Sequence, residues 1–291
     1  MKIVTYNIRY AVGKDNQYDL NRIVNTVGGA DIIALQEVER NYGPPDGPSQ
    51  PEDIAKLLPD YYWVFDAAFD IDGCERRRDG TIRNQRCQHG QMLLSRWPIL
   101  SKRYYPLPRL KIESEFNMQM GALEGVLDTP VGRLRVYDVH FGSVSSEERQ
   151  CQARFLISLV NDAPTQGGAW TGPASIHPER DWSVGLDQLP MPESALVLGD
   201  FNMQPDSLEY QIITNAMTDR NELLLTDILR ELNPGSDTLT WYLNPGLPGN
   251  KKSARFDYCF LTSELVKRVK LSWVDEDARG SDHQPVWIEI I

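Results

Sequence analysis

The stretch ALVLGDFN, residues 195–202, places four apolar residues directly before Gly199, Asp200, Phe201 and Asn202. A short apolar run that ends at glycine is typical of a strand buried on both faces of a sheet. The side chains of Asp200 and Asn202 would then lie at the end of that strand. These residues also favour an Asx-type turn, so the segment alone supports a structural turn and a functional site equally.

The same arrangement of a polar residue beside an apolar strand recurs along the chain. Strands are predicted at residues 3–6, 32–35, 134–139 and 285–290. Strand ends that share one rim of a sheet form a rigid platform for function. A single polar residue after a strand is usually only a turn, but five such places indicate a site. The polar residues concerned are Asn7, Glu37, His140, Asp200 with Asn202, and Asp282 with His283.

The remaining pattern predicts packed β-sheets flanked by helices. Because strands occur in neighbouring pairs with few helices between them, a parallel doubly wound sheet is not expected. Long loops are expected at residues 70–89, rich in Cys and Arg, and at residues 161–193, which hold Trp170 and Trp182. Helices are predicted at residues 19–27, 54–58 and 145–159, and further strands at 61–65, 92–95, 122–127, 256–261 and 266–274.

Composition indicates one domain over residues 1–291. The apolar fraction of 41% is enough for a substantial core, and no repeat or low-complexity tract divides the chain. The formal net charge of −11 opposes nucleic-acid binding in general, although solubility alone also explains such a charge. The basic run of Arg76, Arg77, Arg78, Arg83 and Arg86 is interrupted by acids, which fits a solvated loop or a guide for an anionic substrate.

Cysteine usage and the N-terminus bear on the compartment. Four cysteines are too few for a disulfide scaffold in 291 residues. Cys151 and Cys259 are interpreted as buried thiols, and pairing of Cys74 with Cys87 stays open. No apolar stretch approaches transmembrane length, and no signal-peptide pattern precedes the first strand. A cytoplasmic location is expected, with a secreted or periplasmic one left open if a leader has been removed.

Two acidic residues, Glu37 and Asp257, each allow a functional and a purely structural interpretation. Glu37 is either a solvated side chain or a hard oxygen ligand for Mg²⁺ or Mn²⁺. Asp257 interrupts the apolar strand at residues 256–261, where burial of a carboxylate is costly unless it is paired. His283 is a natural partner, because such a pair would fix the tautomer of the ring and raise its basicity. The alternative is that Asp257 faces water.

Six segments together resemble the endonuclease/exonuclease/phosphatase superfamily, which has the deoxyribonuclease-I-like fold. In chain order they are TYNIRY (5–10), LQEV (35–38), DVHF (138–141), GDFN (199–202), RFDY (255–258) and SDH (281–283). Six motifs occur in the expected order over nearly the whole chain, and so many ordered matches do not arise by chance. The resemblance implies a four-layer α/β/β/α sandwich of two mixed β-sheets flanked by helices, with the site at one edge of the sheets.

The resemblance also implies a role for each matching position. Glu37 would bind the catalytic Mg²⁺, for which Mn²⁺ is a possible substitute, and Asn7 would assist it. Asp282 would lie near a metal, and whether one ion or two act stays open. Asp200 would orient and deprotonate the attacking water. The phosphoryl oxygens would be held by Asn202, His140 and His283, with Asp257 supporting His283.

The expected function is therefore Mg²⁺-dependent hydrolysis of a phosphate ester by water. A small-molecule or lipid-derived phosphodiester is favoured over duplex DNA, because the chain is acidic and because His140 resembles the deoxyribonuclease and sphingomyelinase types. The alternatives are a deoxyribonuclease-I-like or AP-type nuclease, a sugar- or inositol-phosphate phosphatase, and an inactive binding module on the same fold. No GxSxG, P-loop or HExxH motif supports a competing chemistry.

Overall fold

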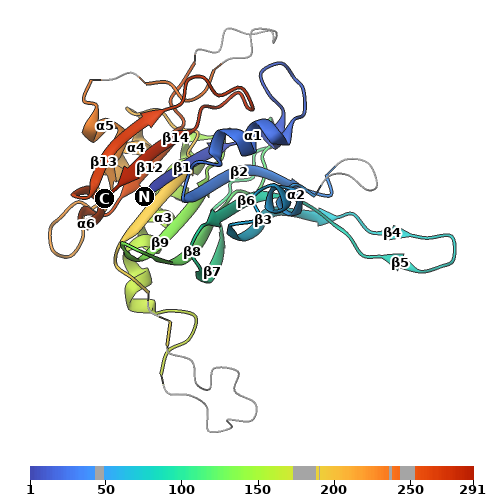
Figure 1. Cartoon of the computed structure of the whole chain (residues 1–291), viewed down its shortest axis with the longest axis horizontal. Helices are drawn as coiled ribbons and strands as arrows, with labels where there is room; N and C mark the ends of the chain where they lie inside the picture. Colours follow the sequence, from blue (N-terminus) through green and yellow to red (C-terminus); the bar gives the residue numbers. More distant parts are fainter. Residues whose placement is uncertain (43–48, 173–187, 190, 236–237, 243–252) are drawn as a thin grey trace.

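A computed structural model describes residues 1–42, 49–172, 188–189, 191–235, 238–242 and 253–291 (Figure 1). Most of the chain forms two six-stranded sheets. The first has the order β13-β14-β1-β2-β6-β3, with β1 Lys2–Asn7, β2 Ile32–Arg40, β3 Tyr62–Asp72, β6 Arg86–Ser95, β13 Val269–Val274 and β14 Val286–Ile290. The second has the order β11-β12-β10-β9-β8-β7, with β7 Ile99–Pro106, β8 Gly121–Thr129, β9 Gly132–His140, β10 Ala195–Asp200, β11 Thr226–Asp227 and β12 Asp257–Leu261.

Most of the helices lie against the outer faces of the two sheets, whereas the last two, which hold Ile228 and Leu265, pack against the apolar layer between the sheets. The helices are η1 Arg9–Ala11, α1 Leu20–Val27, α2 Gln50–Leu57, α3 Ser146–Gln166, α4 Leu208–Thr214, α5 Ile228–Leu232 and α6 Ser263–Val266. A two-stranded ribbon, β4 Glu75–Arg76 with β5 Ile82–Arg83, projects from the body (Figure 1). Within the described residues, no helix is both long and apolar enough to cross a membrane.

Three apolar layers show how the sheets and helices stack. On β1, Ile3 packs in the cluster between the two sheets, whereas Val4 packs in the cluster that holds Ile23 of α1. A third cluster joins the second sheet to α3 and α4. Because the central strands bury both faces, they appear in the sequence as continuous apolar runs. The α/β/β/α sandwich of two mixed sheets predicted from the sequence is confirmed.

Strand direction brings the ends of several strands to one edge. In the first sheet β1 and β2 are parallel, and in the second sheet β9 and β10 are parallel. The carboxyl ends of parallel neighbours lie at the same edge of a sheet. The backbone N–H of Ile8 donates to Gln36 O just beyond β1, and that of Phe141 donates to Asp200 O just beyond β9. The ends of β1, β9 and β10 carry Asn7, His140 and Asp200. The predicted end of the strand before Glu37 is wrong, because β2 continues past Glu37 to Arg40.

The prediction of a loop at residues 70–89 is wrong. The strands β3 and β6 remain paired out to Asp72 and Arg86, and the ribbon β4–β5 continues the hairpin as an arm (Figure 1). Arg86 Nε donates to Asp70 Oδ1 at 2.7 Å across the two strands. The arm has little buried surface, so its strands lack the alternation of apolar and polar residues that would have revealed them. Strand β7 and helix α4 were also not predicted.

Other expectations near α3 and the cysteines need correction. The helix continues to Gln166, six residues into the loop predicted at 161–193, and residues 173–187, including Trp182, lie outside the described part of the chain. Cys151 is exposed, not buried, because it lies opposite the apolar face of α3. Cys259 is buried as expected, and Cys74 and Cys87 are both free thiols. Residues 266–274 form the end of α6 and then β13, not one strand.

Candidate active site

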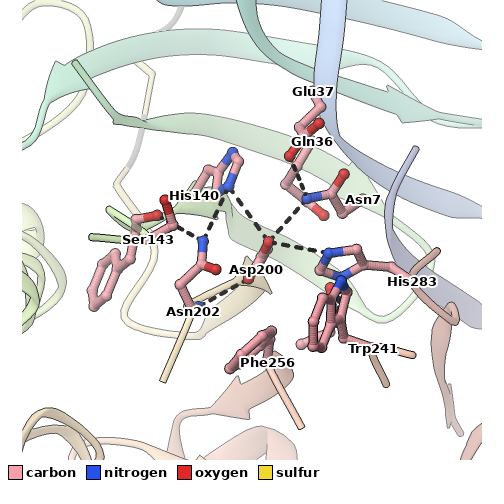
Figure 2. Close-up of polar contacts among 12 residues, drawn as sticks. Asn7, Gln36, Glu37, His140, Ser143, Asp200, Asn202, Trp241, Phe256 and His283 are labelled. Carbon is pink, nitrogen blue, oxygen red and sulfur yellow. Dashed lines mark hydrogen bonds and ion pairs between the residues drawn. The ribbon is translucent and has the colours of Figure 1, made fainter. Parts of the chain in front are cut away.

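The carboxylate of Asp200 is the centre of a polar cluster built from both sheets (Figure 2). Its Oδ2 atom accepts a hydrogen bond from Asn7 Nδ2 at 2.9 Å. The same oxygen lies 3.4 Å from His140 Nε2 and 3.8 Å from His283 Nε2. Asp200 and both rings are buried. Three segments far apart in the sequence therefore converge on one carboxylate oxygen.

Local structure explains how Asp200 reaches this position. Strand β10 pairs with β9 so that Asp200 is opposite His140, and with β12 so that Asp200 is opposite Asp257. The preceding Gly199 has φ 148°, and a Cβ there would lie 1.9 Å from Val139 O. No other residue fits such a close backbone approach. Asp200 Oδ1 also accepts the N–H of Asn202 at 2.9 Å, so the Asx turn and the polar cluster are both present.

The surroundings of Asp200 favour its charged form. Burial raises the pKa of the carboxyl, but nearby His283 and His140 and the Asn7 amide outweigh burial and lower the pKa to about 2. The carboxylate in turn raises the pKa of His140, although burial of that ring acts in the opposite direction. Asp200 is thus an anion across the neutral range and accepts hydrogen bonds only. It can orient a water molecule through one of that water's protons.

His283 is held by a buried carboxylate on its far side. Its Nδ1 atom lies 2.9 Å from Oδ2 of Asp257, a side chain with no exposed surface. Burial lowers the pKa of His283, yet Asp257 and Asp200 together raise it to about 10. The hydroxyl of Thr240 accepts the backbone N–H of Asp257 at 3.0 Å and so fixes the start of β12. The pairing expected from the cost of burying Asp257 is present in the structure.

Glu37 owes its orientation to a β-bulge. The register between β2 and β6 shifts between Gln36 and Val38, which leaves Glu37 as the extra residue, with φ 60°. A bulge re-aims one side chain without ending the strand. Asn7 Nδ2 donates to Glu37 Oε1 at 3.0 Å as well as to Asp200, while Asn7 Oδ1 accepts the N–H of Arg9. The Asn7 amide therefore bridges the two carboxylates.

Asp282 lines the cavity onto which this bridge faces. Its Oδ2 atom accepts Trp241 Nε1 at 3.3 Å and is 3.7 Å from Arg9 Nε. This cavity, of about 190 Å³, is lined by Arg9, Tyr10, Glu37, Met118, Met120, His140, Ser143, Asp200, Asn202, Trp241, Asp282 and His283. Of the residues predicted for the site, only Asn7 and Asp257 do not line this cavity, because both lie behind it and hold its lining residues.

The donor set around the cavity fits a hard divalent cation. Glu37 and Asp282 offer carboxylate oxygens, the ligands that Mg²⁺ and Mn²⁺ prefer. A second grouping, Asp200 with Asp257 and His283, brings ligand atoms within 4.8 Å of one another. This grouping is a second place where the described residues could hold a metal ion.

Sequence reasoning missed several side chains of the cavity. Trp241 lies between the bridges it makes with Ala254 and His283, outside any strand, and no periodic pattern marks it. Its ring packs against Phe256 with centroids 5.5 Å apart. Met118 and Met120 come from the irregular stretch before β8, and Ser143 from the turn before α3.

Comparison with known proteins agrees with this architecture. The sequence profile of the Endonuclease/Exonuclease/phosphatase family matches residues 4–283, so the chain belongs to that family. Among solved structures, an endonuclease/exonuclease/phosphatase from Beutenbergia cavernae DSM 12333 is similar with a TM-score of 0.69 and 20% identity over 99% of this chain and 70% of that one. No curated protein matches the chain.

Two further solved structures show the same fold. A mannosyl-6-phosphatase from Bacteroides thetaiotaomicron VPI-5482 has a TM-score of 0.61 and 15% identity, covering 100% of this chain and 99% of that one. A 3′ phosphatase from Neisseria, bound to a product DNA hairpin, has a TM-score of 0.62 and 20% identity over 100% and 99% of the two chains. At these identities the similarity defines the fold and leaves the substrate open.

Proposed function

We propose that the chain is a Mg²⁺-dependent hydrolase of a small-molecule or lipid-derived phosphodiester. The observation that carries the proposal is the convergence of Asn7, His140 and His283 on the ionised carboxylate of Asp200. Membership of the family supports a phosphate-ester hydrolase that depends on a divalent metal. The carboxylate of Glu37, presented by its bulge beside Asn7, is the proposed metal ligand, with Asp282 as a second oxygen donor at the cavity wall.

The proposed reaction is attack of water on phosphorus. A bound divalent ion supplies positive charge that stabilises the phosphoryl oxygens in the transition state. The Asp200 carboxylate orients the water and accepts its proton as the new P–O bond forms and the bond to the leaving oxygen breaks. His283, protonated because of Asp257, donates from Nε2 to a phosphoryl oxygen, and His140 and the Asn202 amide donate to others. These donors face developing negative charge.

The shape and charge of the surface favour a small substrate. The cavity lining includes none of the arginines of the basic run, which are Arg76, Arg77, Arg78, Arg83 and Arg86. The arm that carries this run projects from the body (Figure 1). Lys251 and Lys252 form a second basic pair in the sequence, and both lie outside the described residues. Because these arginines do not line the cavity and the net charge of the chain is −11, duplex DNA is the weaker candidate.

The decisive experiment compares bis-p-nitrophenyl phosphate with p-nitrophenyl phosphate, each with Mg²⁺, with Mn²⁺ and with EDTA. Faster metal-dependent release of p-nitrophenol from the diester is expected, with none in EDTA. A preference for the monoester would replace the proposal with a sugar- or inositol-phosphate phosphatase. Turnover that persists in EDTA would contradict the metal-dependent mechanism, and no turnover of lipid and nucleotide diesters as well would favour a binding module.

A further inference from the structure

A pair of cations that form no ion pair with any described residue lies near the active-site cavity. Lys14 and Arg279 line an open depression together with Asp15 and Arg22. Arg22 is neutralised within it, since its guanidinium contacts Asp15 at 2.8 Å and Asp19 at 3.3 Å. Among the described residues, Lys14 and Arg279 form no ion pair. The depression therefore presents two cations without a carboxylate in ion-pair contact, in a chain whose net charge is −11.

The fold holds these two cations near each other despite their repulsion. A Cβ on Gly13 would lie 2.7 Å from Arg279 O, so this glycine lets the loop that carries Lys14 pack directly against the segment that carries Arg279. The Lys14 ammonium is half-buried and lies 4.8 Å above the ring of Tyr242. Burial lowers the pKa of Lys14, and the guanidinium of Arg279 lowers it further, whereas Asp282 raises it. An anion bound here would remove the repulsion.

The depression is linked to the catalytic cavity through Tyr242. The backbone N–H of Tyr242 donates to Asp282 O at 3.1 Å, and the preceding Trp241 lines the cavity and contacts the Asp282 carboxylate. Arg9, another cavity residue, reaches back to the loop by donating to Gly13 O at 3.5 Å. The two cations are thus one residue layer away from the wall against which a substrate phosphate would lie.

We infer that Lys14 and Arg279 form a subsite for a second phosphate of the substrate, one that is bound but not hydrolysed. The inference rests on the proposed phosphoester hydrolysis and narrows its substrate to molecules that carry two phosphate groups. Such a group comes either from a neighbouring phosphate of a nucleotide chain or from a bisphosphorylated small molecule. Both present a dianion or a diester anion to the same two side chains.

The test is a binding measurement that needs no turnover. Calorimetric titration in EDTA compares thymidine 3′,5′-bisphosphate with thymidine 5′-monophosphate, and inositol 1,4-bisphosphate with inositol 1-phosphate. At least one bisphosphate is expected to bind about tenfold more tightly than its monophosphate, the value of one good charged contact. The comparison that shows this preference, thymidine or inositol, identifies the source of the second phosphate. In the double variant Lys14→Gln, Arg279→Gln the preference should disappear while monophosphate affinity is kept.

A matched control removes the same charge elsewhere. Lys111 and Arg220 are well exposed and each faces a carboxylate, Glu113 and Glu193 respectively. The double variant Lys111→Gln, Arg220→Gln should keep the bisphosphate preference. Equal affinity of the unmodified chain for both members of each pair, or an unchanged preference in the Lys14 and Arg279 variant, would overturn the inference. Failure of the proposed function is recognised separately, as absence of metal-dependent bis-p-nitrophenyl phosphate hydrolysis by the unmodified chain.

Discussion

Asn7 Nδ2 lies 2.9 Å from Asp200 Oδ2, although the two residues are 193 positions apart in the sequence. Asn7 ends β1 of the first sheet and Asp200 ends β10 of the second, so this hydrogen bond joins the two sheets at the edge that carries the site (Figure 2). The same amide also holds Glu37. The proposed metal ligand and the proposed base are thereby fixed relative to each other by a single neutral side chain.

Replacement of Asp200 by Asn should remove the base and leave the fold intact. The amide keeps the shape of the side chain but cannot accept a proton from water. We expect turnover in the presence of Mg²⁺ to fall by at least about a hundredfold, with an unchanged far-UV circular dichroism spectrum. The matched control is Asp206→Asn, in the exposed turn that follows. Near-normal turnover of the purified Asp200 variant, or an equal loss in the control, would contradict the role given to Asp200.

How much the sequence could predict differs between the sheets and the site. Continuous apolar runs identified the central strands because those strands bury both faces, and polar residues after these runs identified Asp200, His140 and Glu37, although β2 continues past Glu37 to Arg40. The arm at residues 70–89 was missed since a hairpin exposed on both sides needs no apolar alternation. Trp241 was missed because its place depends on contacts with His283 and Ala254 that are remote in sequence.

Replacement of Glu37 by Gln should weaken metal binding more than it affects folding. A neutral amide is a poorer ligand for a hard divalent cation than a carboxylate. Titration of the variant with Mn²⁺, followed by electron paramagnetic resonance, should show an affinity at least about tenfold below that of the unmodified chain. Glu39→Gln, two residues along the same strand and outside the cavity, is the control. Unchanged Mn²⁺ affinity in the Glu37 variant would place the metal elsewhere.

The ring of His283 should remain protonated well above neutral pH in the metal-free protein. Its pKa of about 10 exceeds the ordinary 6.5, chiefly because of Asp257, and the replacement Asp257→Asn should lower it. The chain has four histidines, so an NMR titration in EDTA can follow each ring. Because the pKa is raised in the folded state, the protonated ring stabilises the fold fully below pH 6.5 and progressively less as the pH rises towards 10. A neutral His283 ring at about pH 8 would contradict this arrangement.

The ion pair between Arg255 and Asp227 should be the most sensitive charged contact for stability. Arg255 Nη2 lies 2.6 Å from Asp227 Oδ1, and both side chains are almost fully buried behind β12. Arg255→Met would leave the Asp227 carboxylate buried without its cation, which should lower the free energy of unfolding by about 3–5 kcal/mol in a urea titration.

Two comparisons separate this effect from loss of a large side chain. The second replacement Asp227→Asn, added to Arg255→Met, should recover part of the stability, because it removes the uncompensated charge while Tyr210 still donates to the same side chain. Arg220→Met breaks an ion pair with Glu193 whose side chains are 73% and 71% exposed, and solvent screening should leave the unfolding transition unchanged. If Arg255→Met proves as mild as Arg220→Met, the buried pair does not stabilise the sheet edge, and the position of Asp257 two residues along must depend on the Thr240 hydroxyl instead.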